Sequence, residues 1–182
     1  MTNPPRPPET FATARLDARP PRPEDAAAAF AAYANDVEVT RYLSWRAYDG
    51  PEPLRVRFAA QVEAWRTGQG HFAWLLHLRE TGELAGSIGV SPDPHGPLLG
   101  YVLGRKFWGR GLMAETARFV VDWALGQPEI FRVWAVCDVE NPASARVMEK
   151  AGMSREGLLR RWHVCPTIGP EPRACLVYAR VK

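Results

Sequence analysis

A chain of 182 residues, 46% apolar and 24% charged, is long enough to bury one sizeable core and short for two domains. Its 23 basic and 20 acidic residues give a net charge of +3, and they are scattered, so neither nucleic acid nor a membrane is expected as a partner. We find no signal-peptide pattern and no apolar run near the roughly 18 residues that span a bilayer, and we expect a cytoplasmic protein. The three cysteines form no Cys-x-x-Cys pair, which favours thiols in a reducing compartment, and no metal site is expected.

The first third of the chain predicts one strand and two helices. Residues 1–10 carry four prolines without apolar periodicity, and we expect a flexible Pro-rich arm ahead of a single domain at 11–182. Residues 12–19 alternate weakly, as a strand does. Pro23, two acids and a run of alanines predict a helix that extends to about Asn35. Residues 53–67 repeat large apolar side chains near helical spacing and predict a second helix.

The remaining elements predict a mixed sheet. Phe72–Leu78 and residues 84–90 flank a glycine-containing loop, a hairpin pattern. The strand Leu98–Leu103, the helix Leu112–Leu125 and a strand at 131–136 then form a βαβ unit, which requires parallel pairing and a right-handed crossover. A helix opens at Asn141-Pro142 and closes at Gly152, and strands at 154–164 and 174–181 complete the sheet. We expect a single-domain α/β fold with about seven strands and four main helices.

The turn between Leu103 and Leu112 is a candidate phosphate site. Two glycines alternate there with basic side chains, in the stretch RKFWGRG at 105–111. The first turn of a helix presents unpaired amides and partial positive charge, so an anion can bind against glycine backbone at that place. The residues that follow match neither a Walker loop nor a dinucleotide fingerprint. A Gly-x-Gly pair can also serve only to turn a strand into a helix.

A second motif narrows the choice of ligand for the candidate phosphate site. WGRGLMAETA at 108–117 and NPASARVMEKAGM at 141–153 lie on either side of a strand. The pair resembles the GCN5-related N-acetyltransferases, most of all the branch of ribosomal-protein alanine N-acetyltransferases, and the resemblance covers nearly the whole chain. It implies two splayed central parallel strands, acetyl-CoA as cosubstrate, no metal, and transfer of an acetyl group to a primary amine.

The resemblance also assigns roles to individual positions. The strand backbone that would bind the pantetheine arm belongs to Tyr101, Val102 and Leu103. Asn141 would contact the cofactor near the splayed strands. The family signature usually has Gln or Arg where this chain has Trp108, and a small residue where it has Met113; both changes occur in the alanine-acetylating branch. The amides that would bind the pyrophosphate are those of Gly109, Arg110, Gly111, Leu112, Met113 and Ala114.

The chemistry requires a neutral amine as nucleophile and an acid for the departing thiolate. Many relatives have a tyrosine as the acid where this chain has Met148, and the branch implies Ser144 instead. The alternative is that Ser144 only serves the helix start. Relatives often carry a glutamate base where this chain has Leu98-Leu99, so no base is assigned. By their chemistry, the candidates for the base are Asp93, His95, His71 and Glu83, and each can instead be interpreted as a solvated loop or strand residue. Glu115 can be interpreted as a partner of the helix dipole.

The acceptor is open between a protein or peptide N-terminus, a polyamine, an aminoglycoside-like drug and a metabolite amine. Tyr42, Trp45 and Tyr48 form an aromatic segment that would wall a narrow slot for a terminal amine, or would only pack the first two helices on the sheet. A module that binds acetyl-CoA as a sensor, without efficient turnover, is the alternative to an enzyme. Whether the chain forms a homodimer is also open.

Overall fold

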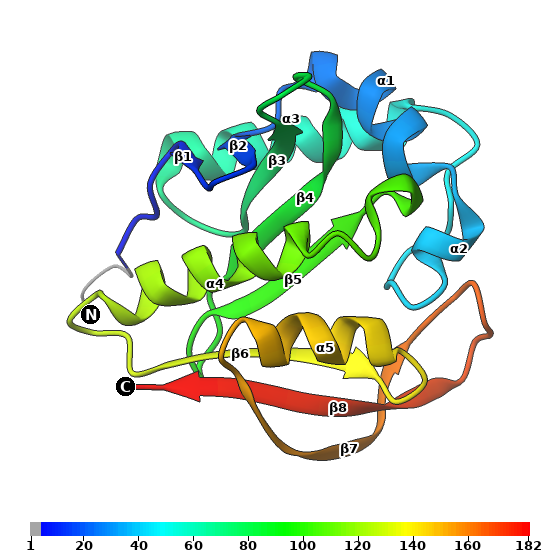
Figure 1. The fold of residues 1–182 in the computed structure, drawn as a ribbon. Coiled ribbons are helices and arrows are strands. Elements are labelled where there is room, and N and C mark those ends of the chain that lie inside the picture. Colours follow the sequence, from blue (N-terminus) through cyan, green and yellow to red (C-terminus); the bar gives the residue numbers. More distant parts are fainter. Residues whose placement is uncertain (1–4) are drawn as a thin grey trace.

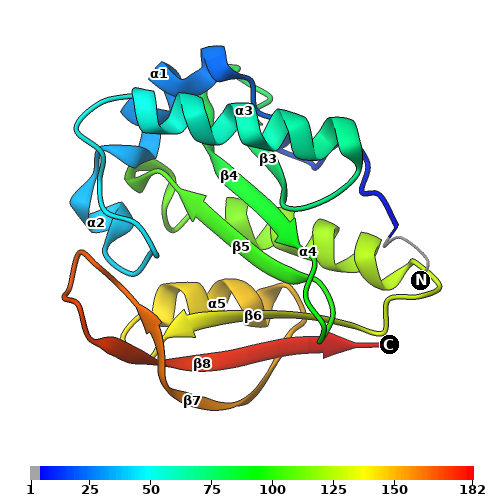
Figure 2. The ribbon, with the colours of Figure 1, turned by 180° about the vertical axis from the view of Figure 1, so that it is seen from behind.

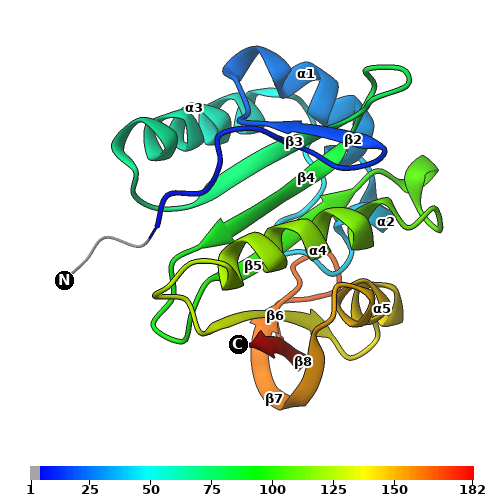
Figure 3. The same ribbon diagram turned by 60° about the vertical axis from the view of Figure 1, so that its left-hand side comes forward.

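Helices cover both faces of one mixed sheet in the computed structural model, which describes residues 5–182 (Figure 1). The sheet order is β1-β2-β3-β4-β5-β6-β8-β7. Figure 3 shows α1 and α3 along one side of β3 and β4, with α4 on the other. The strands are β1 (Phe11–Ala12), β2 (Leu16–Arg19), β3 (Phe72–Leu78), β4 (Leu84–Ser91), β5 (Leu98–Leu103), β6 (Arg132–Asp138), β7 (Ser154–Val164) and β8 (Pro172–Val181). The helices are α1 (Ala26–Ala29), α2 (Val37–Thr40), α3 (Glu52–Thr67), α4 (Leu112–Leu125) and α5 (Pro142–Lys150).

Two apolar clusters hold the layers together. The larger packs α4 and α5 on the sheet through residues such as Leu99, Leu112 and Met148. The smaller packs α1 and α3 on the other face, around Phe58 and Leu75. Successive residues of a strand point to opposite faces, so the alternation along β3, β4 and β5 divides their side chains between the two clusters.

The two central parallel strands separate after one pair of residues. β5 and β6 are paired at Leu98 and Trp134, and the Trp134 amide donates to the Pro97 carbonyl at 3.1 Å. Beyond this point the strands diverge toward the side where α2 and the β7–β8 loop lie (Figure 2). β4 stays paired with β5 along its length, from Leu98 to Leu103. The prediction of splayed parallel central strands is confirmed.

The fold class is confirmed, and the strand count differs by one. The predicted strand at 12–19 is a hairpin: the Thr13 amide donates to the Leu16 carbonyl at 2.8 Å, and β1 pairs antiparallel with β2. The helix that begins at Pro23 continues to Ala34 through short 3-10, α and π segments. The sequence reading missed α2, whose N-terminus is capped by Asp36 through the Glu38 amide at 2.9 Å.

The predicted arm falls partly outside the described residues, because residues 1–4 are not among them. In the described part, Arg6 donates to the Trp65 carbonyl, and the Trp74 indole donates to the Pro8 carbonyl at 3.0 Å. The stretch before β1 therefore contacts the end of α3 and the start of β3. Among residues 5–182, no helix is long and apolar enough to cross a membrane.

Candidate active site

The glycine turn before α4 presents a row of unpaired amides. Gly109 and Gly111 both have φ +74°, a conformation that side chains other than glycine's rarely adopt. Within residues 5–182, the amides of positions 109–114 donate to no acceptor. They lie at the N-terminus of the 14-residue helix α4, where the helix dipole adds partial positive charge. The turn thus has the backbone geometry of an anion site.

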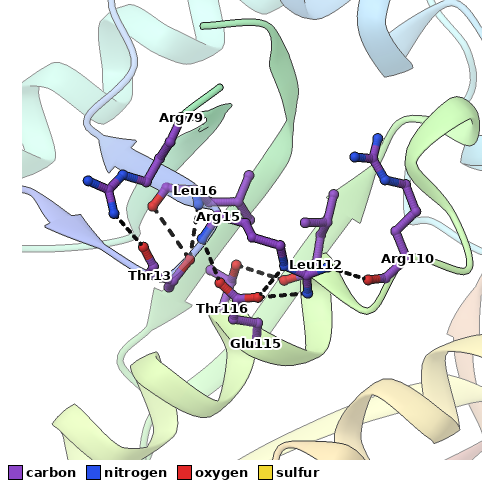
Figure 4. A network of polar contacts seen from close by, with 8 residues as sticks. All are labelled: Thr13, Arg15, Leu16, Arg79, Arg110, Leu112, Glu115 and Thr116. Atoms are coloured by element: carbon purple, nitrogen blue, oxygen red, sulfur yellow. Dashed lines mark hydrogen bonds and ion pairs between the residues drawn. The ribbon is translucent and has the colours of Figure 1, made fainter. Parts of the chain in front are cut away.

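A residue from the β1–β2 turn holds this site in place (Figure 4). The Arg15 guanidinium donates to the Arg110 carbonyl at 2.8 Å and lies 2.7 Å from Glu115 Oε2. Its Nη2 would lie 3.7 Å from a Cβ at Gly111. Burial raises the pKa of Glu115, but hydrogen bonds from Thr13 and Arg15 outweigh it and hold this pKa below its ordinary value. Arg15 therefore adds a positive charge beside the amides, and the sequence reading did not include it.

The backbone of β5 faces the gap between the diverging strands. The Gly104 amide donates to the Ala85 carbonyl at 2.8 Å, so even-numbered residues of β5 point their backbone groups toward β4. Tyr101 and Leu103 consequently point theirs toward β6, where no strand pairs with them. Val102 has its backbone groups committed to β4. The Leu103 carbonyl accepts a hydrogen bond from the Trp108 indole at 2.7 Å.

Two hydroxyls meet at the inner end of this gap. Tyr101 Oη lies 2.7 Å from Ser144 Oγ and 3.1 Å from the Ser144 carbonyl. Burial raises the pKa of Tyr101, so its hydroxyl stays protonated. The cap of α5 is the Asn141 side chain, which accepts from the Ser144 amide at 3.1 Å. Ser144 thus serves the helix start through its backbone, while its hydroxyl is directed at Tyr101.

A buried ion pair fixes the loop that carries Asn141. The Asp138 side chain is fully buried and accepts two hydrogen bonds from Arg173, at 2.5 and 3.0 Å. It also accepts from the Glu140 amide at 2.9 Å, and its carbonyl accepts from the Asn141 amide at 2.9 Å. Burial raises the pKa of Asp138, but the bonds from Arg173 and Glu140 outweigh it and lower that pKa overall. The sequence reading missed this pair because β6 and β8 are distant in the chain.

The structure separates the candidate bases. Glu83 is exposed and forms an ion pair with Lys106. Asp93 and His95 share an outer loop, where Asp93 Oδ1 accepts from the His95 amide at 2.8 Å. His71 is partly buried at the start of β3, and its Nδ1 lies 2.8 Å from Ser91 Oγ.

The aromatic segment lies on the α1–α3 face. Trp45 and Tyr48 stack with ring centroids 5.1 Å apart, and both pack against the smaller cluster. The Arg41 guanidinium lies 5.6 Å from the centroid of the Tyr42 ring. Arg46 Nε donates to the Pro166 carbonyl at 3.0 Å, which joins this segment to the β7–β8 loop.

The three cysteines are buried free thiols, and burial raises the pKa of Cys137, beside Ser144, to about 11. Such a thiol is protonated at neutral pH and is a poor nucleophile. Among the described residues, no group of three or more His, Cys, Asp or Glu side chains could hold a metal ion.

Comparison with known proteins agrees with this geometry. Residues 15–154 match the family described as acetyltransferase (GNAT) domain. The N-acetyltransferase YoaA of Bacillus subtilis, whose role is uncharacterised, is 30% identical over 153 residues, which cover 82% of this chain and 85% of YoaA. The fold matches the ribosomal-protein-S5-alanine acetyltransferase of Vibrio fischeri with a TM-score of 0.79 at 19% identity, over 94% of this chain and 96% of that one. It matches RimL, the ribosomal L7/L12 alpha-N-protein acetyltransferase in complex with coenzyme A, with a TM-score of 0.82 at 20% identity, over 95% and 98%. The chain belongs to the GNAT family of acetyltransferases.

Proposed function

We propose that this acetyltransferase uses acetyl-CoA to acetylate a primary amine, by direct attack of the amine on the thioester. One observation carries the proposal: the gap between β5 and β6 joins two kinds of group that this reaction needs. Unpaired amides lie at its outer end, at positions 109–114, and the hydroxyls of Tyr101 and Ser144 lie at its inner end. RimL, which has this fold, is described in complex with coenzyme A.

The residues present fit such a cosubstrate. Open space surrounds Gly109, where a Cβ would meet no atom within 4 Å, so a pyrophosphate can approach the backbone there. Arg15 and Arg110 add positive charge near the turn. The free backbone groups of Tyr101 and Leu103 can pair with the amides of a pantetheine arm laid along β5, as a further strand would. Trp108 would share or release the Leu103 carbonyl when the arm binds.

The two hydroxyls supply a proton to the leaving group. The amine nitrogen forms a bond to the acetyl carbon, and the carbon–sulfur bond breaks, which leaves a thiolate. Ser144 Oγ donates its proton to this thiolate and regains one from Tyr101 Oη, 2.7 Å away. The amine nitrogen releases its proton to solvent, and Tyr101 regains one from solvent to complete the turnover. A hydroxyl is a weak acid in water, but here the thiolate would otherwise carry an unsolvated charge in the gap.

The acceptor is a primary amine at the end of a peptide or of a small polar molecule. RimL and the Vibrio fischeri enzyme, by their names, act on ribosomal proteins. In this chain the stacked pair Trp45 and Tyr48 offers aromatic walls for a narrow slot, on the opposite face of the sheet from α4. No long acidic run is present that would recruit a basic tail. A narrow slot admits an amine at the end of a chain more easily than a lysine held on a folded surface, so such a lysine is disfavoured as acceptor.

Release of coenzyme A thiol tests the proposal. Purified protein is mixed with acetyl-CoA and a panel of peptides with varied first residues, polyamines, aminoglycosides and amino-acid amines. We expect thiol release that depends on the amine, with acetylated product detected by mass. Tight binding of acetyl-CoA without release from any amine would contradict an enzyme and would support the sensor.

A further inference from the structure

His71 forms a hydrogen-bonded pair with a serine on the neighbouring strand. The β3–β4 register places Phe72 opposite Val90, so His71 and Ser91 are the next opposed residues, and His71 Nδ1 lies 2.8 Å from Ser91 Oγ. The ring lies against Gly89, where a Cβ would come within 2.6 Å of Cε1 and 2.8 Å of Nε2. Only glycine at this position leaves room for the imidazole.

This pair lies on the face of the sheet that is free of α4. Gly89 is opposite Gly100 of β5, and directly opposed residues share a face. Leu99, the neighbour of Gly100, belongs to the cluster under α4, so Gly89 and Gly100 face the α3 side. Gly100 is exposed, and a Cβ there would meet no atom within 4 Å. An open floor therefore lies one strand from the His71 ring, beside Tyr101.

The second ring nitrogen of His71 is available. Nε2 has no hydrogen-bond partner among residues 5–182. The one side-chain polar atom in that range that is both sealed from solvent and unpaired is Gln61 Oε1, so Nε2 keeps some contact with solvent. When Nδ1–H donates to Ser91 Oγ, Nε2 carries the lone pair and can accept a proton.

The environment keeps the ring neutral. Burial, aided by the positive charge of Arg57 on α3, lowers the pKa of His71 to about 4. Arg57 also lies 5.9 Å from the centroid of the Trp45 ring, so its charge acts near both the aromatic pair and the imidazole. The same desolvation and the same positive charge lower the pKa of an ammonium group that enters this space, which makes its proton easier to remove.

We propose that His71 is the general base of the transfer and that Ser91 orients it; this rests on the proposed function. Nε2 takes one proton from the acceptor ammonium and passes it to solvent. The neutral amine then attacks the thioester carbon from the Gly100 side, while the cosubstrate occupies the gap beside Tyr101. After releasing the first proton to solvent, Nε2 takes the second proton from the nitrogen as the carbon–sulfur bond breaks, and the thiolate gains one proton through Ser144.

The kinetic test uses His71→Asn, whose amide replaces Nδ1 and keeps a partner for Ser91 but removes Nε2. We expect kcat/KM near pH 7 to fall by about 100-fold, the lower range for loss of a general base. The deficit should shrink as the pH rises past the pKa of the acceptor amine, since the amine then arrives unprotonated. The Kd for acetyl-CoA should stay unchanged. His71→Gln is the second variant if the first does not fold.

His77→Gln is the matched control, because His77 lies on the same strand and its Nε2 faces Arg19 at 3.4 Å, away from this floor. It should keep the wild-type kcat/KM at every pH. A His71 variant with wild-type kcat/KM near pH 7, or with a deficit that is the same at every pH, would overturn the assignment of His71 as the general base. Failure of the wild-type protein to acetylate any amine would instead overturn the proposed function, and the base with it.

Discussion

Tyr101 Oη lies 2.7 Å from Ser144 Oγ, and this contact joins β5 to α5 across the place where β5 and β6 separate. Ser144 lies within the motif NPASARVMEKAGM, whereas Tyr101 lies on β5, ahead of the motif WGRGLMAETA, so neither motif contains both residues. Because burial raises the pKa of Tyr101, the phenol remains a donor and Ser144 can pass its proton on without losing it permanently. The pair is more useful as a proton source than the serine alone.

Ser144→Ala should lower kcat with little change in the KM for acetyl-CoA, because an acid acts on the transition state. The expected loss is about 100-fold. Tyr101→Phe should lower kcat less, since the serine hydroxyl stays in place. Steady-state kinetics with a good acceptor measures both. An unaltered kcat in Ser144→Ala would limit Ser144 to the helix start.

Asn141→Ala serves as the contrast to the serine variant. It removes the cap of α5, which should cost about 1 kcal/mol of stability, and should also weaken acetyl-CoA binding. Thermal unfolding and the KM for acetyl-CoA should therefore both change, whereas Ser144→Ala should change neither.

Gly111→Val should abolish measurable binding of acetyl-CoA, because a side chain at this φ of +74° obstructs the approach of a phosphate to the amides. Arg110→Ala should weaken binding only modestly, since the backbone amides make most of the contacts with the pyrophosphate. Calorimetric titration of acetyl-CoA measures both. The strain of a non-glycine residue here is itself about 1–2 kcal/mol.

Gly68→Val controls for that strain. Gly68 caps α3 with φ +73° and has open space around its Cβ position, so it matches Gly111 in backbone but lies at the end of α3. It should lose stability and keep its affinity for acetyl-CoA. Equal affinities in Gly111→Val and the wild-type protein would rule out the pyrophosphate assignment.

Short-range patterns were enough to predict the central elements. β3, β5, α4 and β7 have the predicted bounds, since apolar periodicity and flanking glycines define each of them within the chain itself. The β1–β2 hairpin was missed because its turn lacks Gly, Pro, Asn and Asp. Thr13 supplies the turn instead, through Oγ1, which accepts from the Leu16 amide at 3.2 Å.

Contacts between distant segments could not be predicted from those patterns. Arg15 and Glu115 meet only because β1–β2 and α4 lie side by side in the folded sheet, and the same holds for Asp138 with Arg173. Glu115 was read as a partner of the helix dipole, and the structure adds an ion pair to that role. Asp36, which follows an asparagine, carried a capping signal for α2 that was overlooked.

Arg15→Ala should raise the Kd for acetyl-CoA by about 1.4- to 5-fold, because an exposed charged contact is worth about 0.2–1 kcal/mol. The effect should diminish with added salt, which screens exposed charges. Arg79→Ala is the control: Arg79 donates to the Thr13 carbonyl at 3.3 Å in the same network but points away from the glycine turn (Figure 4). A Kd in Arg15→Ala that equals the control's would show that Arg15 only supports the hairpin.

Trp45→Ala should lower kcat/KM for accepted amines by at least about tenfold, if the ring walls the acceptor slot, since aromatic contacts dominate such pockets. Trp162→Ala removes an exposed tryptophan on β7, with 52% of the residue accessible, and should leave kcat/KM unchanged. Kinetics with several amines is combined with thermal unfolding. If Trp45→Ala only lowers the melting temperature, Trp45 and Tyr48 pack the core and the slot does not exist.

Arg173→Met should destabilise the fold by about 3–5 kcal/mol near pH 7, because it leaves the buried Asp138 carboxylate without its partner. In the wild-type protein the pKa of Asp138 is below its unfolded value, so the stabilisation from the pair is present above about pH 4 and is lost as the pH falls through the folded pKa. In the variant, burial acts unopposed and raises this pKa, so protonation relieves the buried charge.

The difference in unfolding free energy between the two proteins should therefore be largest near pH 7 and shrink toward about pH 4. Urea unfolding at several pH values measures it, and Asp138→Asn with Arg173→Met should restore part of the stability near pH 7. A difference that does not vary with pH would mean that the lost packing of Arg173, and not the charge of Asp138, sets the cost.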